Sequence, residues 1–85
     1  MKGQKPVKMF TLSTCSHCKA TKKFMKDNNI DFDYTDVDLL SGAEQGTVLD
    51  EVKKYNPRFS FPTILIGRDV IVGFQETEIR KALGI

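Results

Sequence analysis

The only two cysteines of this chain lie three residues apart, in the run Cys-Ser-His-Cys at residues 15–18. The run follows a stretch with the apolar pattern of a strand and precedes a lysine-rich stretch with the period of a helix. This order places the sulfur of Cys15 at a helix N-terminus, where free backbone N–H groups and the helix dipole favour a thiolate. The sulfur of Cys18 lies one turn further along, at a spacing that permits a disulfide. The motif therefore predicts a reversible dithiol between a strand and a helix.

Length and charge limit the other interpretations. A chain of 85 residues is expected to form one domain, taken as residues 1–85 with a flexible N-terminal segment at 1–6. Its 13 basic and 11 acidic residues give a net charge of +2, which does not favour a nucleic-acid partner. The sequence shows neither a signal peptide nor a span of about 20 apolar residues, so we expect a soluble cytoplasmic protein without a membrane partner. In that reducing compartment, an isolated C-x-x-C pair is more typical of catalysis or metal binding than of a structural disulfide.

Hydrophobic periodicity predicts seven elements in the order strand, helix, strand, helix, strand, strand, helix. The first helix is expected to end at a left-handed Asn28-Asn29 pair, and the last two strands to form a hairpin. The start of the second helix stays open, because Ser41 with Glu44 and Thr47 with Asp50 both fit a capping box. One face of this helix is expected to carry Val48, Leu49, Val52 and Tyr55, and Asn56-Pro57 is expected to end it. The predicted ranges are 7–12, 16–28, 31–37, 43–55, 61–66, 70–72 and a final helix from residue 76.

Right-handed crossovers turn this order into an α/β fold, with a four-stranded mixed sheet and helices on both of its faces. The cysteines then lie at the C-terminal end of a central strand, where sheets of this kind place their sites.

Three pieces of the chain, in this order and at these spacings, match one known family. They are the cysteine run 15–18 after a strand, the Phe-Pro-Thr run 61–63 before the hairpin, and Gly73-Phe74 before the last helix. With them the chain resembles the glutaredoxins, small members of the thioredoxin superfamily, over nearly its whole length. The resemblance implies a thioredoxin-like fold and the activity of a thiol–disulfide oxidoreductase.

The two cysteines have distinct expected roles. Cys15 is predicted to be the exposed thiolate of low pKa that attacks a target disulfide, and Cys18 the thiol that resolves the mixed disulfide. His17 lies between them, where an imidazolium would stabilise the Cys15 thiolate, although a solvated ring without effect is equally compatible with the sequence. For Lys19 and Lys22 the favoured interpretation is a solvated helix face.

The proline of the 61–63 run has a second predicted role. In the glutaredoxins the proline before the third strand is cis, and Pro62 matches it, whereas the sequence without the resemblance favours a proline that starts a strand in trans. By the resemblance, Pro62 lies against the disulfide, and the backbone of Phe61 is free to pair with an extended substrate. Thr63, Gly73 and Phe74 are included among the expected substrate contacts.

The glutathione site of the family matches this chain poorly. Leu12 occupies the position of a lysine that precedes the first cysteine in glutathione-binding members, and Val72 and Gln75 occupy positions in their Gly-Gly and aspartate region. The remaining contacts would be the Phe61 backbone, the helix N-terminus and Arg58, which would equally fit a surface charge. The Ser-Phe-Pro-Thr run 60–63 and Gly73-Phe74 instead resemble proteins that thioredoxin reductase reduces. We therefore leave the electron donor open between glutathione and thioredoxin reductase, and expect no tightly bound cofactor.

Two further hypotheses remain open. A non-enzymatic carrier of a metal or iron–sulfur cluster would dimerise through Cys15. A zinc site within one chain is not expected, because it needs four ligands and the sequence offers two cysteines and one histidine. A redox-inert adaptor would use the fold only for binding. The favoured hypothesis remains a monomeric dithiol oxidoreductase with disulfide-containing proteins as partners.

Overall fold

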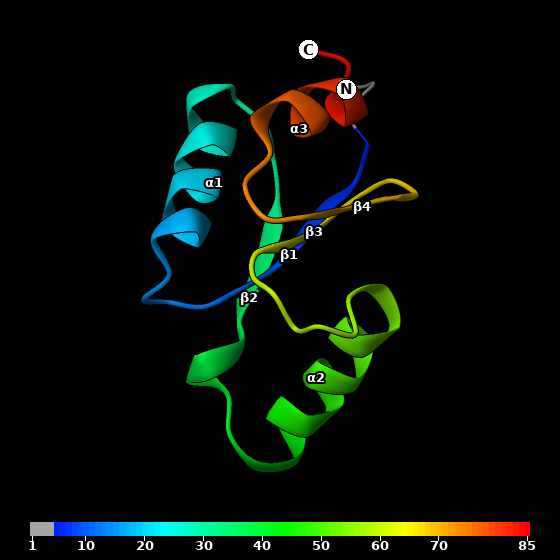
Figure 1. Cartoon of the computed structure of the whole chain (residues 1–85). Coiled ribbons are helices and arrows are strands. Elements are labelled where there is room, and N and C mark those ends of the chain that lie inside the picture. The colour runs from blue at the N-terminus through cyan, green and yellow to red at the C-terminus, as the bar shows by residue number, and fades with distance from the viewer. Residues whose placement is uncertain (1–4) are drawn as a thin grey trace.

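A computed structural model of the chain describes residues 5–85 (Figure 1). The predicted order of strands and helices is confirmed within this range, and a short 3-10 helix, η1, is added after the second strand. Of the predicted flexible segment 1–6, residues 1–4 lie outside the described part, and the carbonyl of Pro6 accepts a hydrogen bond of 2.9 Å from the N–H of Gly67. The elements are β1 (Val7–Thr11), α1 (Ser16–Asp27), β2 (Asp33–Asp36), η1 (Val37–Leu39), α2 (Gly42–Tyr55), β3 (Thr63–Ile66), β4 (Asp69–Val72) and α3 (Glu76–Leu83).

The strands form one mixed sheet in the order β2-β1-β3-β4. Strand β1 runs parallel to β2 and antiparallel to β3, and β4 is antiparallel to β3. This arrangement confirms the predicted thioredoxin-like α/β fold. Because β1 is an interior strand, the loop that follows it emerges in the middle of one end of the sheet, and this loop carries Cys15.

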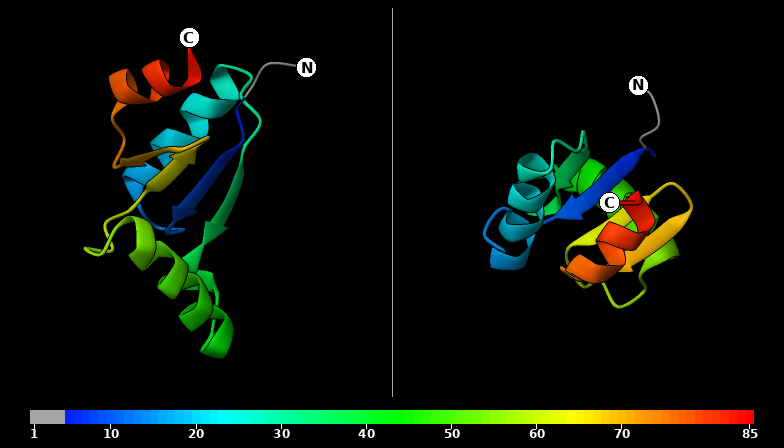
Figure 2. Two further views of the ribbon diagram at one scale, coloured as in Figure 1. Left: turned by 90° about the vertical axis from the view of Figure 1, so that its right-hand side faces the viewer. Right: turned by 90° about the horizontal axis from the view of Figure 1, so that it is seen from above.

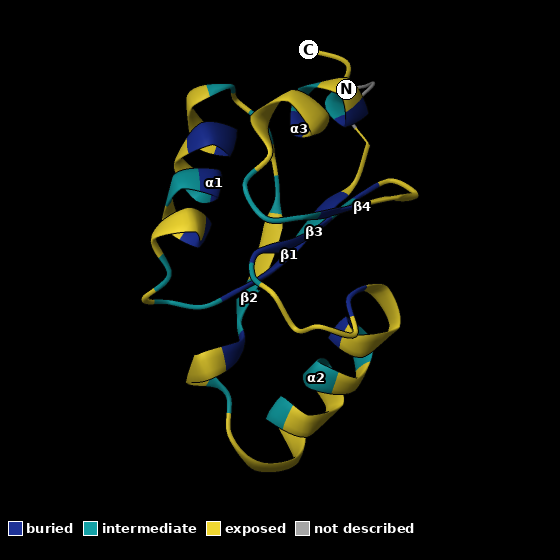
Figure 3. Cartoon of the chain, viewed as in Figure 1, coloured by how far each residue is buried: buried dark blue, intermediate teal, exposed yellow. Residues whose placement is uncertain are grey.

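The two faces of the sheet bury two separate clusters of side chains, because successive residues of a strand point to opposite sides. Helices α1 and α3 cover one face and α2 covers the other (Figure 2). Figure 3 shows the central strands buried and much of α2 exposed to solvent. The larger cluster contains Val7, Met9, Phe24, Met25, Ile64, Ile66, Ile71, Ile79 and Ala82, and the smaller contains Phe10, Val37 and Val52.

The end of α1 is as the sequence predicts, whereas the start of α2 lacks the capping bond that Ser41 could have made. Asn29, with φ of 57°, confirms the predicted left-handed end of α1. Helix α2 begins at Gly42, and the preceding Ser41 makes no side-chain capping bond. Instead, the side-chain amide of Gln45 donates to the carbonyls of Val37 and Leu40, at 3.1 Å each, and thereby joins η1 to α2. A further correction concerns Tyr55, which was expected on the buried face of this helix but is 41% exposed.

Candidate active site

Cys15 is the N-cap residue of α1. Its backbone is extended, with φ of −81° and ψ of 122°, and its N–H donates to the carbonyl of Leu12 at 3.2 Å. The sulfur of Cys15 accepts a hydrogen bond of 3.4 Å from the backbone N–H of Cys18, one of the free donors of the first helical turn. The side chain is partly exposed, so that a reagent in solution can reach the sulfur.

Cys18 has a contrasting environment. Its side chain is fully buried, and its sulfur accepts a hydrogen bond of 3.5 Å from the backbone N–H of Leu12. Burial raises the pKa of the Cys18 thiol to about 12, against the smaller opposing effect of the Leu12 N–H. The two sulfurs are not joined in a disulfide. At neutral pH the Cys18 thiol therefore keeps its proton.

The pKa of Cys15 moves in the opposite direction. Partial burial tends to raise this pKa, but hydrogen bonds from the side chain and backbone N–H of Cys18 and from the backbone of His17 together lower it below the ordinary value. The backbone of His17, rather than its ring, is the group through which this residue contributes here. The ring is exposed, and its predicted role as an imidazolium beside the thiolate stays a prediction.

The lysines that follow the cysteines are not equivalent. Lys19 is exposed, in agreement with the predicted solvated face, and its N–H closes the first helical turn on the carbonyl of Cys15 at 3.0 Å. Lys22 departs from that expectation. Its side chain is only 18% exposed, its Nζ lies 3.0 Å from Asp36 Oδ1, and the ammonium lies 4.0 Å from the ring centre of Tyr34. The hydroxyl of Thr11 also donates to Asp36, so β1, β2 and α1 meet at this carboxylate.

A second carboxylate, which the sequence analysis missed, holds the loop before Cys15. Asp38 in η1 accepts a hydrogen bond of 2.8 Å from the backbone N–H of Ser13 and another from its hydroxyl. These bonds lower the pKa of Asp38 below its usual range. The signal in the sequence was the predicted strand-helix-strand order, because a crossover of this kind brings the C-terminal ends of the first two strands to the same edge.

The proline loop lies beside the cysteine loop. The Phe61–Pro62 peptide bond is cis, which confirms the prediction from the resemblance. Phe10 in β1 is paired with Thr63 in β3, so the residues that follow Phe10 and those that precede Thr63 leave the sheet at the same end. Leu12 and Phe61 accordingly pack against the same buried cluster.

Asn56, which was expected only as part of the end of α2, organises the proline loop. This side chain is 5% exposed. Its amide nitrogen donates to the carbonyl of Ser60 at 2.8 Å and to Thr63 Oγ1 at 3.2 Å, while its oxygen accepts from the N–H of Arg58 at 3.2 Å. The Thr63 hydroxyl, predicted as a substrate contact, is itself buried and donates to the Ser60 carbonyl at 2.8 Å.

The remaining predicted contacts lie at different depths. Arg58 is exposed, and Gly73 holds Pro62 in place, because its N–H donates to the Pro62 carbonyl at 2.8 Å. Gly73 has φ of +85°, a conformation that suits glycine. The ring of Phe74 packs at an angle of 61° against Phe24, 5.8 Å between centres, and thus joins the core. Contacts of these residues with a substrate stay predictions.

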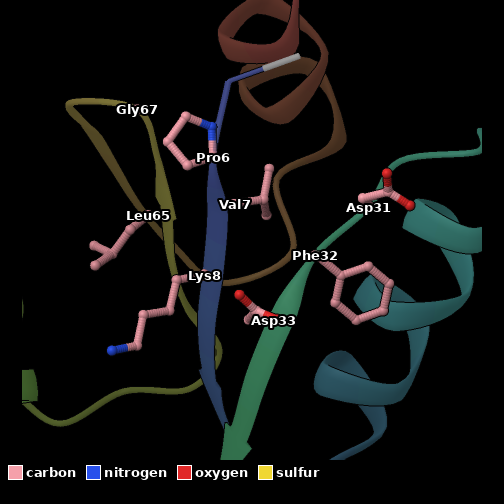
Figure 4. A pocket seen from close by; sticks show the side chains of 8 residues that line it. All are labelled: Pro6, Val7, Lys8, Asp31, Phe32, Asp33, Leu65 and Gly67. Atoms are coloured by element: carbon pink, nitrogen blue, oxygen red, sulfur yellow. The ribbon is translucent and has the colours of Figure 1, made fainter. Parts of the chain in front are cut away.

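Features of the described chain outside the two loops differ from the candidate site. A groove of about 550 Å³ lies at the opposite end of β1 and is lined in part by Lys8, Asp31 and Asp33 (Figure 4). Within residues 5–85, no three or more His, Cys, Asp or Glu side chains are grouped so that they could hold a metal ion. No helix in this range is long and apolar enough to span a membrane.

Comparison with known proteins agrees with the fold. The glutaredoxin family model matches residues 7–71. The structure of methanoredoxin from Methanosarcina acetivorans is 43% identical, with a TM-score of 0.91 over 96% of this chain and 87% of that one. A glutaredoxin from Methanosarcina mazei Go1 is 46% identical, with a TM-score of 0.87 over 100% of this chain and 85% of that one.

A curated relative supports the same assignment. A glutaredoxin-like 8.6 kDa protein in the rubredoxin operon of Clostridium pasteurianum is 32% identical over 77 residues, which are 91% of this chain and 96% of the relative. The family model covers more than half of the present chain, and the two cysteines lie close together at a helix N-terminus. The chain therefore belongs to the glutaredoxin family of the thioredoxin superfamily.

Proposed function

We propose that the protein is a dithiol thiol–disulfide oxidoreductase that reduces protein disulfides or mixed disulfides with glutathione. The contrast between the two sulfurs carries this proposal. Cys15 is partly exposed and has a lowered pKa, whereas Cys18 is buried and has a pKa of about 12. A thiolate that a substrate can reach, beside a protonated thiol that it cannot reach, suits an ordered two-step exchange.

In the first step the Cys15 thiolate attacks one sulfur of the substrate disulfide. A mixed disulfide forms, and the other substrate sulfur leaves as a thiolate and takes up a proton. In the second step Cys18 gives up its proton and attacks the Cys15 sulfur, which releases the second substrate thiol and leaves a Cys15–Cys18 disulfide. Two electrons pass from the protein to the substrate. The cycle starts from two reduced thiols, a state that the cytoplasm maintains.

The proline loop would hold the substrate during the exchange. Among the described residues, the backbone N–H and C=O of Phe61 make no hydrogen bond within the chain, and Pro62 is fixed through its carbonyl by Gly73. An extended segment next to a substrate cysteine can therefore pair with Phe61 in the manner of an added strand. In this proposal Pro62 acts as the substrate clamp.

Replacement of each cysteine tests the two roles separately. Cys15→Ser is expected to abolish reduction of every disulfide substrate. Cys18→Ser is expected to form a mixed disulfide that persists, because the resolving attack is lost. Mass spectrometry after mixing Cys18→Ser with a peptide disulfide detects the adduct on Cys15. No adduct with any disulfide, or full activity of Cys15→Ser, would contradict the proposal.

The electron donor is tested by two coupled assays that follow NADPH consumption. One contains glutathione, glutathione reductase and a small glutathionylated disulfide, and the other contains thioredoxin reductase and an insulin-like protein disulfide. Turnover only in the first assay would mean that other contacts replace those missing at Leu12, Val72 and Gln75. Turnover only in the second would assign the protein to thioredoxin reductase as its donor.

A further inference from the structure

The exposed tip of the proline loop carries an aromatic residue in an unfavourable backbone conformation. Phe59 has φ of 54°, in the left-handed region, which is uncommon for a bulky side chain. The conformation is fixed, because the N–H of Phe59 donates to the carbonyl of Asn56 at 3.0 Å. The side chain is nevertheless 40% exposed, and residues 57–60 are all exposed (Figure 3). Phe59 therefore combines a strained backbone conformation with a side chain that is not fully buried.

The charges around the site are sharply segregated. The two segments that build it, residues 13–26 and 52–63, contain four and three basic residues, seven of the 13 in the chain, and none of its 11 acidic residues. Some of these charges are neutralised, since Lys22 pairs with Asp36 and Lys23 with Asp27. In the part of the chain that the structure describes, Lys19 and Arg58 make no ion pair.

The unpaired charges and the exposed ring lie at the same end of the sheet. Lys19 is one turn into α1 after Cys15, and Arg58 and Phe59 precede Pro62 in the adjacent loop (Figure 1). The carboxylate of Asp38 also lies near the loop before Cys15, where Ser13 holds it by hydrogen bonds without neutralising its charge. The surface formed by Lys19, Arg58 and Phe59, here called the rim, is therefore basic with one aromatic side chain.

We propose that the rim is a docking surface for an acidic protein segment, so that the preferred substrates are protein disulfides flanked by carboxylates and an apolar side chain. The proposal rests on the proposed oxidoreductase function. Opposite charges would guide the segment to Lys19 and Arg58, and its apolar side chain would cover Phe59. Glutathione has carboxylates but no apolar side chain for Phe59, and for this reason we favour a protein segment over the tripeptide as the occupant.

The test uses two peptide disulfides that are identical except for their flanking residues, which are Asp and Leu in one and Lys and Leu in the other. The pre-reduced protein is mixed with each peptide, and the second-order rate of reduction is measured at low and high salt. We expect the acidic peptide to react at least about ten-fold faster at low salt, and the difference to shrink at high salt. Equal rates for the two peptides would overturn the proposal.

Variants locate the effect on the rim. Phe59→Asn relieves the left-handed strain, because asparagine tolerates this conformation, and so should fold normally. Phe59→Asn and Arg58→Gln are each expected to lower the rate of reduction of the acidic peptide about five-fold, relative to the rate of reduction of neutral hydroxyethyl disulfide. The matched control is Arg68→Gln, an identical charge change at the exposed β3–β4 turn, at the other end of the sheet.

The possible outcomes separate the two proposals. An equal loss of the reduction rate for the acidic peptide in Arg58→Gln and Arg68→Gln would mean that only net charge matters. That result would overturn docking on the rim. A loss in Arg58→Gln confined to turnover with glutathione would assign the rim to the tripeptide instead. If the wild-type protein reduces neither peptide nor hydroxyethyl disulfide, the proposed oxidoreductase function itself fails.

Discussion

The two loops of the candidate site are held in place by different kinds of interaction. In the cysteine loop, residues 13–18, backbone N–H groups contact both sulfurs, and burial of Cys18 separates its reactivity from that of the partly exposed Cys15. In the proline loop, residues 56–63, the side chain of Asn56 bonds to several parts of the loop and fixes its shape. The difference teaches that the dithiol and the proline loop have separate structural supports, and mutations should disturb one without the other.

The largest expected effect lies within the cysteine loop, in the relative reactivity of its two thiols. With iodoacetamide at pH 7, Cys15 should be alkylated at least about a hundred-fold faster than Cys18, because its pKa is lowered and its sulfur is accessible. Mass spectrometry of quenched samples gives both rates as a function of pH. The midpoint for Cys15 should lie below the value of about 8.5 for an ordinary thiol. Similar rates for the two cysteines would show that the backbone contacts do not set reactivity.

Asn56→Ala should disturb the proline loop alone. The substitution removes the donors to the Ser60 carbonyl and Thr63 hydroxyl inside the protein, and should lower the free energy of unfolding by about 2 to 3 kcal/mol. The matched control is Asn28→Ala, which removes one bond to the Phe24 carbonyl at the end of α1 and should cost about 1 kcal/mol or less.

Urea denaturation measures both variants, and the alkylation profile of Cys15 is followed in parallel. The separation of the two loops predicts an unchanged Cys15 midpoint in Asn56→Ala. A shifted midpoint would show that the loops are coupled. An equal loss of stability in the two variants would show that Asn56 is not the main support of the proline loop.

The sequence predicted the parts of this site that depend on local pattern. The cysteine run and the left-handed Asn29 follow from short-range rules, and the cis Pro62 from the resemblance to the family. Hydrophobic periodicity was sufficient for the order of the elements, because each helix and most strands bury one face. The reactive end of the molecule was therefore accessible from sequence alone.

The supports that the sequence did not reveal are hydrogen bonds between polar side chains and distant backbone groups. Asp38 lies 25 residues from Ser13, and nothing in the spacing of the two residues marks them as partners. Asn56 follows a helix and precedes a proline, where it was expected simply to end α2. Such polar contacts have no period, so their partners become visible only when the fold brings the segments together.

The ion pair between Lys22 and Asp36 provides a test with a smaller expected effect on stability. Lys22→Met leaves the Asp36 carboxylate, 14% exposed, without its cation, and should lower stability by about 1 to 2 kcal/mol. The control is Lys23→Met, because Lys23 and Asp27 form a pair with side chains that are 77% and 58% exposed. That variant should change stability by less than about 0.5 kcal/mol. Equal losses from the two substitutions would mean that burial of the Lys22 pair has no energetic weight.

The smallest expected effect concerns the link between Ser13 and Asp38, which depends on pH. The hydrogen bonds from Ser13 lower the pKa of Asp38, so the stability that they provide is present above the ordinary carboxyl pKa of about 4 and is lost as pH falls through the lowered value. Asp38→Asn should therefore be less stable than the wild type at pH 7, and the two should converge near pH 2. Denaturation between pH 2 and 7 measures this difference. A stability difference between the wild type and Asp38→Asn that stays constant with pH would mean that Asp38 supports the cysteine loop through its shape rather than its charge.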